Sequence, residues 1–231
     1  MKILVIDVGG SHVKLMLSGN DERRKFDSGK DFVPKDFVKQ VLAQTSDWKY
    51  EAISIGFPAA IVDGKLVREP VNLPKEWFGF DFEAAFKKPV KVINDAAMQA
   101  LGSYEGGRML FLGLGTGLGS GMVLNNVVVS LELGQLRYSD EETLEERVGK
   151  HALKKLGATK WERAVHEVVA ILQHGFIVDD VVIGGGNAKR LEKLPKGTRL
   201  GANENAFLGG MRMWGESPFS GNTKKHPLVI V

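Results

Sequence analysis

One segment of the chain has glycine at every second position from residue 113 to residue 121: Gly113-Leu114-Gly115-Thr116-Gly117-Leu118-Gly119-Ser120-Gly121. Alternate residues of an extended chain share a face, so one face here carries no side chains. Each glycine costs about 0.5–1 kcal/mol relative to alanine, so an offsetting gain is expected. Close approach of a ligand to bare backbone N–H groups and tight packing of the sheet are the two candidate explanations. The spacing does not fit the G-x-G-x-x-G fingerprint of dinucleotide-binding proteins.

A second glycine turn follows the first apolar run, in Asp7-Val8-Gly9-Gly10-Ser11-His12-Val13-Lys14. Gly9 and Gly10 leave the backbone accessible, Ser11 offers a hydroxyl group, and Lys14 offers a positive charge. Asp7 could hold Mg²⁺ through water. Phosphoryl transfer requires the phosphates of the donor to be held from both sides, so two such turns in one chain predict a phosphate site.

The pair Asn94-Asp95 stands where an apolar run, Val90 to Ile93, meets an alanine-rich helical stretch. The simplest local interpretation of the pair is a helix N-cap. A carboxylate at the carboxyl end of a strand could also take the proton from a hydroxyl nucleophile. The two glycine turns favour catalysis by Asp95.

The surrounding pattern alternates strands and helices, which indicates an α/β protein. Continuous apolar runs predict buried strands at 2–8, 52–57, 90–93, 109–114 and 181–183. Asp63-Gly64 and Asn125-Asn126 predict tight hairpin turns. Helical spacing predicts helices at 36–44, 144–156, around 161–172 and at 203–214. The strand–turn–strand unit occurs near residue 9 and again near residue 117, which predicts two related lobes with a cleft between them.

The composition is that of a folded, water-soluble protein: 43% of the 231 residues are hydrophobic and 26% are charged. Cysteine is absent, which excludes disulfides, thiolate zinc sites and cysteine nucleophiles. No apolar run reaches the roughly 18 residues of a membrane span, so we expect a cytoplasmic protein with no membrane partner. The net charge is only +3. Basic clusters are either solvated surface or a phosphate track; they lie at residues 23–25, 87–88, 154–155 and 189–190, with Lys193 and Lys196 nearby.

Four ordered motifs resemble those of the ROK family of sugar kinases, in the actin–hexokinase superfamily: Asp7-Val8-Gly9-Gly10-Ser11, Ile93-Asn94-Asp95-Ala96, Gly113 to Ser120 and Val182-Ile183-Gly184-Gly185-Gly186. Gly-Gly-Ser-x-Val-Lys and the segment 145–161 look most like polyphosphate/ATP glucokinases. The resemblance implies two lobes of the actin/hexokinase (ribonuclease H-like) type with an interlobe cleft. We place the N-terminal lobe at 1–94, completed by 211–231, and the C-terminal lobe at 95–210.

The resemblance also implies roles for particular residues. Asp95 would be the general base on the 6-hydroxyl of a hexose, most simply glucose. The sugar would be bound by Asn72, Asn94, Glu132, Gln135 and Glu145. ATP or polyphosphate would contact Gly9, Gly10, Ser11, Lys14, Gly115, Thr116 and Gly117, with Gly184, Gly185 and Gly186 at its distal end. Asp7 would hold Mg²⁺, and a homodimer would be usual.

Two features depart from the family pattern. Gln135 stands where the family usually has histidine, which puts the identity of the sugar in doubt. The zinc-binding cysteines of many members are missing, so no zinc is expected, as in polyphosphate glucokinases. A transcriptional repressor of the family would need a DNA-binding module, but the first glycine turn lies too close to Met1 to leave room for one, and no nucleic-acid partner is expected. A non-catalytic sugar sensor is the remaining alternative, although a sensor needs neither Asp95 nor the glycine turns.

Overall fold

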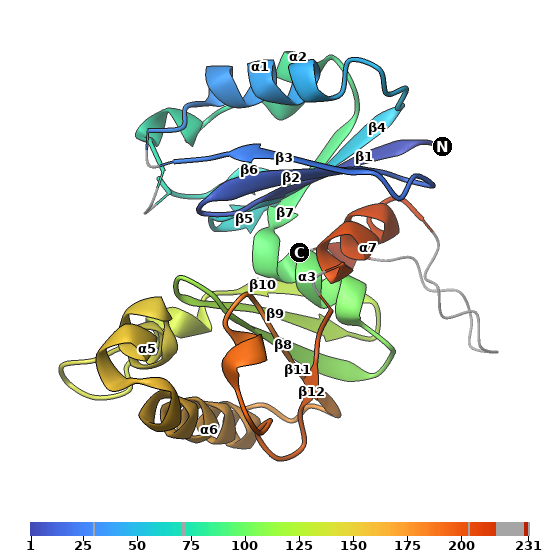
Figure 1. The fold of residues 1–231 in the computed structure, drawn as a ribbon. Coiled ribbons are helices and arrows are strands. Elements are labelled where there is room, and N and C mark those ends of the chain that lie inside the picture. The colour runs from blue at the N-terminus through green and yellow to red at the C-terminus, as the bar shows by residue number, and fades with distance from the viewer. Residues whose placement is uncertain (30, 71–72, 203, 216–228, 231) are drawn as a thin grey trace.

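The computed structural model describes residues 1–29, 31–70, 73–202, 204–215 and 229–230. Figure 1 shows two sheets that lie one above the other, with two helices between them. The first sheet contains β1 (Ile3–Val8), β2 (His12–Leu17), β3 (Arg23–Asp27), β4 (Ala52–Phe57) and β7 (Val90–Asn94). The second contains β8 (Arg108–Leu114), β9 (Leu118–Leu124), β10 (Val127–Leu131), β11 (Asp180–Gly184), β12 (Arg199–Leu200) and β13 (Val229–Ile230). A small hairpin pairs β5 (Ile61–Val62) with β6 (Lys65–Leu66).

The two sheets repeat one topology. The order of the first is β3-β2-β1-β4-β7, and five strands of the second follow the equivalent order, β10-β9-β8-β11-β12. In each sheet the first three strands along the chain are antiparallel, the fourth pairs in parallel with the first, and the fifth pairs in parallel with the fourth. This repeat confirms the prediction of two related α/β lobes.

The burial of the strands follows from their sequences. All six residues of β1 and of β4 are buried, as expected for central strands that are covered on both faces. Strand β2 alternates, with Val13, Leu15 and Leu17 in the core and Lys14 exposed on the other face. The first glycine turn therefore joins a fully buried strand to a strand with one solvent-exposed face.

Helices α1 (Pro34–Gln44) and α2 (Phe82–Phe86) cover the outer face of the first sheet (Figure 1). On the second sheet this role falls to α4 (Leu144–Val148), α5 (Lys150–Leu156) and α6 (Ala158–Gly175). Short 3₁₀ helices lie at η1 (Lys75–Trp77), η2 (Leu133–Gln135) and η3 (Ala188–Arg190). The positive φ angles of Asp63, Gly64, Asn125 and Asn126 confirm both predicted hairpin turns.

The prediction of a single helix over 144–156 is wrong, because Gly149 divides it into α4 and α5. Gly149 is extended, with φ −70° and ψ 177°. A Cβ atom there would lie 2.7 Å from the carbonyl oxygen of Thr116, and the next residue, Lys150, donates its N–H to that oxygen at 3.0 Å. The break lets the chain approach the second glycine turn.

Helices α3 (Asp95–Ser103) and α7 (Asn205–Arg212) cross between the lobes (Figure 1). A Cβ atom on Gly102 would overlap the carbonyl oxygen of Asn205, and one on Gly209 would overlap that of Met98. The two backbones are therefore in direct contact. Beside this contact, the Arg212 guanidinium donates hydrogen bonds to carbonyl oxygens at the C-terminal end of α3. A positive charge at this end of a helix stabilises the helix.

At the end of the chain, β13 pairs with β10 of the second sheet, whereas α7 packs on α3 and on β1. The proposed lobe boundary after residue 94 falls between β7 and α3, and it stays a prediction. Among the described residues, no helix is both long enough and apolar enough to cross a membrane.

Candidate active site

Asp95 is the first residue of α3, directly after β7, and is free of the capping role. Asn94 is the N-cap: its Oδ1 accepts from the N–H groups of Ala96 at 2.9 Å and Ala97 at 3.1 Å. The Asn94 amide also donates to the carbonyl oxygen of Ala59 at 3.1 Å, and the residue is only 8% exposed. Division of labour between the two residues leaves the Asp95 carboxylate available for chemistry.

The surroundings of Asp95 favour its neutral form. Burial raises its pKa to about 7, and the negative charges of Asp7 and Glu132 act in the same direction. A carboxyl group with this pKa accepts and releases protons near neutral pH, which a general base requires.

Glu132 lies between β10 and η2, and it is held there by Ser120 of β9. The buried Ser120 hydroxyl donates to the carbonyl oxygen of Leu131 at 2.9 Å and accepts from the N–H of Leu133 at 3.0 Å. Burial raises the pKa of Glu132; Arg68, 3.8 Å away, lowers it and Glu145 raises it. The sequence analysis overlooked both Ser120 and Arg68 as parts of the site.

Glu145 enters the same group of carboxylates from α4. The helix begins with a capping box between Thr143 and Glu146, which fixes its first turn. Glu145 Oε2 accepts from the N–H of Leu118 at 3.2 Å, directly beyond the second glycine turn. A Cβ atom on Gly117 would overlap this carboxylate. The second glycine turn and the predicted sugar-binding glutamate are thus in contact.

The two glycine turns face each other. A Cβ atom on Gly10 would lie 3.9 Å from the hydroxyl oxygen of Thr116. Within the part of the chain that the structure describes, the N–H groups of Gly10, Ser11, Thr116 and Gly117 donate to no protein acceptor. Free N–H groups on two opposed turns can bind the oxygen atoms of a phosphate chain.

Packing accounts for part of the glycine alternation. A Cβ atom on Gly119 would lie 3.0 Å from Ala96 Cβ, and one on Gly121 would lie 3.0 Å from Ala97 Cα. These glycines let α3 lie directly on the second sheet. Gly115 has no atom within 4 Å of its Cβ direction, so its open side faces free space. Ligand contact stays a prediction for Gly115, Thr116 and Gly117.

The third glycine segment lies beside the second glycine turn. Gly184 pairs with Gly113 across β11 and β8, and Gly185 adopts a φ of 83° that favours glycine. Asn187 then donates its backbone N–H to the carbonyl oxygen of Leu114 and its amide to that of Gly115, each at 2.9 Å. The sequence analysis did not single out Asn187, although asparagine after a glycine run is a common turn residue.

Asp7 is the penultimate residue of β1 and is only 6% exposed, and Lys14 Nζ lies 3.1 Å from its Oδ2. Magnesium is usually bound by one or two carboxylates together with water and substrate phosphates. Asp7 fits that role because it lies beside the first glycine turn, whose free N–H groups can bind phosphate oxygens. Among the described residues, no three histidine, aspartate or glutamate side chains form a metal cage. The donor phosphates would therefore supply most of the ligands.

The two remaining predicted sugar contacts are Gln135 and Asn72. Gln135 is exposed at the end of η2, where its backbone N–H donates to the carbonyl oxygen of Glu132 at 3.0 Å. Asn72 lies outside the described residues.

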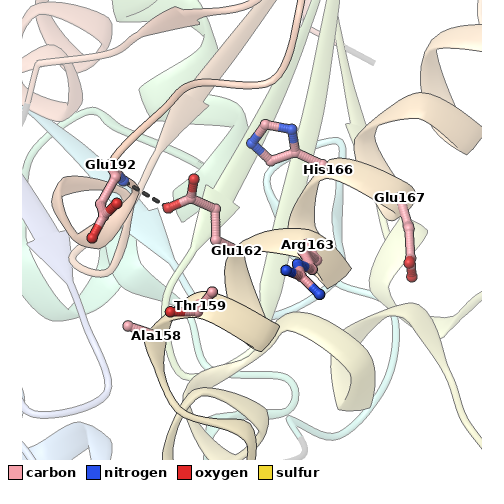
Figure 2. A pocket seen from close by; sticks show the side chains of 7 residues that line it. All are labelled: Ala158, Thr159, Glu162, Arg163, His166, Glu167 and Glu192. Carbon is pink, nitrogen blue, oxygen red and sulfur yellow. Dashed lines mark hydrogen bonds between the residues drawn. The ribbon is translucent and has the colours of Figure 1, made fainter.

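Two cavities are prominent. One, of about 520 Å³, lies between the lobes; it is lined by Asp7, Lys14, Arg23, Arg24, Lys25, Gln99, Gly185, Gly186 and Phe207. The other, of about 400 Å³, lies on α6 (Figure 2). There Glu162 accepts from the N–H of Glu192 at 2.7 Å, and His166 contacts the carbonyl oxygen of Lys193 at 3.0 Å. These groups fasten a loop to the helix, whereas the interlobe cavity adjoins the candidate site and shares Asp7, Lys14, Gly185 and Gly186 with it.

Comparison with known proteins identifies the family of the chain. The model of the ROK family matches residues 3–134. The polyphosphate glucokinase of Mycobacterium tuberculosis (strain H37Rv) is 25% identical over 210 residues, covering 81% of this chain and 78% of the relative.

Two solved structures show the same fold. The inorganic polyphosphate/ATP-glucomannokinase from Arthrobacter sp. strain KM superposes with a TM-score of 0.79 at 22% identity, covering 90% of this chain and 96% of the other. A ROK family glucokinase from Streptomyces griseus, in complex with glucose and AMPPNP, gives 0.74 at 16% identity, covering 92% and 99%. The family match spans more than half of the chain and contains its first glycine turn, Asp95 and Glu132. The chain therefore belongs to the ROK family.

Proposed function

We propose that this protein is a sugar kinase that transfers a phosphoryl group from ATP or polyphosphate to the 6-hydroxyl of a hexose, with glucose as the first candidate. The observation that carries the proposal is the environment of Asp95. This carboxyl group is relieved of capping by Asn94, has a pKa raised to about 7, and belongs to a group of interacting carboxylates beside two phosphate-binding turns.

In this reaction the hydroxyl oxygen of the sugar attacks the terminal phosphorus atom of the donor. Asp95 takes the hydroxyl proton, while the bond from that phosphorus to the bridging oxygen breaks. The products are a sugar phosphate and a donor shorter by one phosphate. A positioned base contributes about 10²–10⁴-fold, and the rest comes from positioning and charge stabilisation.

The remaining residues divide between the two substrates. Glu132 and Glu145 accept hydrogen bonds from sugar hydroxyls, as carboxylates do. Asn94 retains one amide N–H for the sugar. The resemblance to the family adds Gln135 and Asn72 as proposed sugar contacts. The free N–H groups of the two turns, together with Ser11 and Lys14, bind the donor phosphates. Magnesium, when bound at Asp7, supplies charge neutralisation of those phosphates.

The activity of one relative and the ligands bound in another support this assignment. The mycobacterial relative is a polyphosphate glucokinase, and the Streptomyces griseus structure contains glucose and AMPPNP. At these identities the comparison supports a sugar kinase and leaves the sugar and the donor to experiment.

A coupled assay tests the proposal. Purified full-length protein is supplied with Mg²⁺, a panel of hexoses, and either ATP or polyphosphate; sugar 6-phosphate formation is then measured. We expect turnover with glucose and at least one donor. A folded protein that binds glucose in calorimetry but gives no product with either donor would be a sugar sensor, and the proposal would be wrong.

A further inference from the structure

A row of side chains crosses three strands on the face of the first sheet that lines the interlobe cavity. Asp7 of β1 is the cross-strand partner of Lys14 in β2, which in turn is the partner of Lys25 in β3. Partners in antiparallel strands point to the same face, and neighbouring strands lie about 4.7–4.9 Å apart. Arg23, two residues before Lys25, shares this face.

Arg24 also lines the cavity, but its guanidinium is engaged elsewhere. Its guanidinium lies 4.1 Å from the centre of the Trp48 ring and bonds to Asp47, behind the sheet. The run at 23–25, which the sequence presents as one basic cluster, is therefore divided by the strand. All three residues line the cavity, but the Arg24 charge is already neutralised by Glu22 and Asp47.

The cavity is positive along this row. Lys14 pairs with Asp7 and Arg23 pairs with Glu204, each at 3.1 Å. Lys25 is exposed, and among the described residues it forms no ion pair. The opposite wall contributes Gly185 and Gly186. Lys25, which has no ion-pair partner among the described residues, thus lies one strand further from Asp7 than Lys14 does.

We propose that Lys14, Lys25 and Arg23 form a track for the distal phosphates of linear polyphosphate and make this chain prefer it to ATP as donor. The inference rests on the proposed kinase function and deepens it. Each phosphate of the chain carries negative charge, so a longer chain meets each cation of the track. A nucleoside occupying the same space brings no charge to Lys25 or Arg23. The track therefore favours polyphosphate.

The variant Lys25→Gln tests the track, because Lys25 is exposed and lies two strands away from Asp7. The matched control is Lys39→Gln, which removes one exposed lysine from α1 on the outer face of the same sheet. For each protein, kcat/KM is measured with ATP, with inorganic tripolyphosphate and with long-chain polyphosphate, at several salt concentrations.

We expect Lys25→Gln to lower the ratio of kcat/KM for long-chain polyphosphate to that for ATP by about fivefold, as the loss of one phosphate contact implies. The slope of log kcat/KM against log salt should become shallower by about 0.7–0.9 for the long chain. Tripolyphosphate should behave like ATP, because both present three phosphates and neither supplies the distal phosphates that the track would bind. Lys39→Gln should leave both ratio and slope as in the parent.

The outcomes separate the two proposals. Turnover with ATP but none with polyphosphate would overturn the track and leave the kinase assignment standing. Equal effects of Lys25→Gln and Lys39→Gln on the donor ratio would also overturn the track. No turnover with either donor would refute the kinase assignment and the track with it. Calorimetric titration with long-chain polyphosphate provides a readout independent of turnover: Lys25→Gln should weaken binding about fivefold, and unchanged binding would contradict the track.

Discussion

The interlobe site and the α6 cavity both contain acidic side chains, but the charged form of these side chains is stabilised on α6 and destabilised between the lobes. On α6, Glu162 accepts backbone N–H groups from residues 192 and 193, and Glu167 bonds to Arg147 and Tyr138. Each of these carboxylates is satisfied by a fixed donor. Between the lobes, burial and mutual repulsion raise the pKa of Asp95 and of Glu132.

This difference in the environment of the carboxylates distinguishes structural residues from candidate functional residues. A carboxylate whose neighbours stabilise its charge contributes to the fold, whereas carboxylates held together without enough donors require a ligand to complete them. Hydroxyl groups of a sugar and a magnesium–phosphate complex would supply the missing donors and charge. The charge environment of these carboxylates, and not the presence of a cavity alone, identifies the candidate site.

The sharpest test of this contrast is Asp95→Asn. Asparagine has the same shape and cannot take a proton, and the helix cap is unaffected because Asn94 provides it. We expect sugar phosphorylation to fall at least about 100-fold, with an unchanged circular dichroism spectrum. Turnover within threefold of the parent would remove Asp95 from the mechanism.

A pair of glycine substitutions probes the contact between turn and carboxylate. Gly117→Ala should displace Glu145, whereas Gly115→Ala places its methyl group in open space. Because small displacements of substrate-positioning groups are costly, we expect Gly117→Ala to lower kcat/KM for the sugar about 10- to 100-fold. Calorimetry should show weaker sugar binding in Gly117→Ala and near-parental binding in Gly115→Ala. Equal behaviour of the two variants would contradict a role for the Gly117–Glu145 contact.

The raised pKa of Asp95 predicts two pH effects of opposite direction. Activity requires the ionised base, so kcat/KM should fall about tenfold for each unit of acidification below pH 7. Stability should change the other way: the folded state resists ionisation of Asp95, so its contribution is present at about pH 4 and is lost as the pH rises through 7.

Asp95→Asn should therefore melt at a higher temperature than the parent at pH 8, with the difference shrinking towards pH 4. Melting curves at both pH values measure this. A constant difference across the range would mean that Asp95 ionises as readily in the folded as in the unfolded chain.

Arg68→Gln should have a smaller effect. Arg68 lowers the pKa of Glu132 against the effect of burial, so its removal should raise that pKa further. The acid limb of sugar binding should then move to higher pH, with a KM increase of about two- to fivefold at neutral pH, as for an exposed ion pair. A KM profile that coincides with the parent's would show that this ion pair is irrelevant to sugar binding.

Glu162→Gln on α6 should leave sugar phosphorylation unchanged. Its expected effect is on the fold alone, a loss of about 1 kcal/mol in the free energy of unfolding, because the charge-assisted bonds to residues 192 and 193 weaken. Urea denaturation measures this loss. A selective loss of activity would contradict the division between the two regions.

Local pattern was enough to predict much of this architecture. The apolar runs, the paired turns and the placement of Asn94-Asp95 at the end of a strand all depend on neighbours in sequence, and β1, β4, β7 and both hairpin turns follow them. The capping box from Thr143 to Glu146 also matches the sequence motif T-x-x-E, which was not used to predict the start of this helix.

What local pattern could not supply are contacts between distant segments. The break at Gly149 depends on the carbonyl oxygen of Thr116, and the packing of Gly119 and Gly121 depends on α3. Strand β3 was interpreted only as a basic cluster, because its single buried residue, Phe26, gives too weak an alternation to predict a strand. Ser120 and Arg68 act on Glu132 across the fold, and nothing in their own neighbourhoods indicates that partner.

The glycine contacts between α3 and α7 limit the substitutions that this sequence can tolerate. Even a single methyl group at Gly102 or Gly209 would force the two helices apart, and α3 carries Asp95 at its first residue. A shift of about 1 Å at a reacting group can cost about 100-fold in rate. In a saturation-mutagenesis map, intolerance should therefore appear in two separate places. One surrounds the substrates, and the other lies at this helix crossing, where substitutions that leave the chain folded would still silence the enzyme.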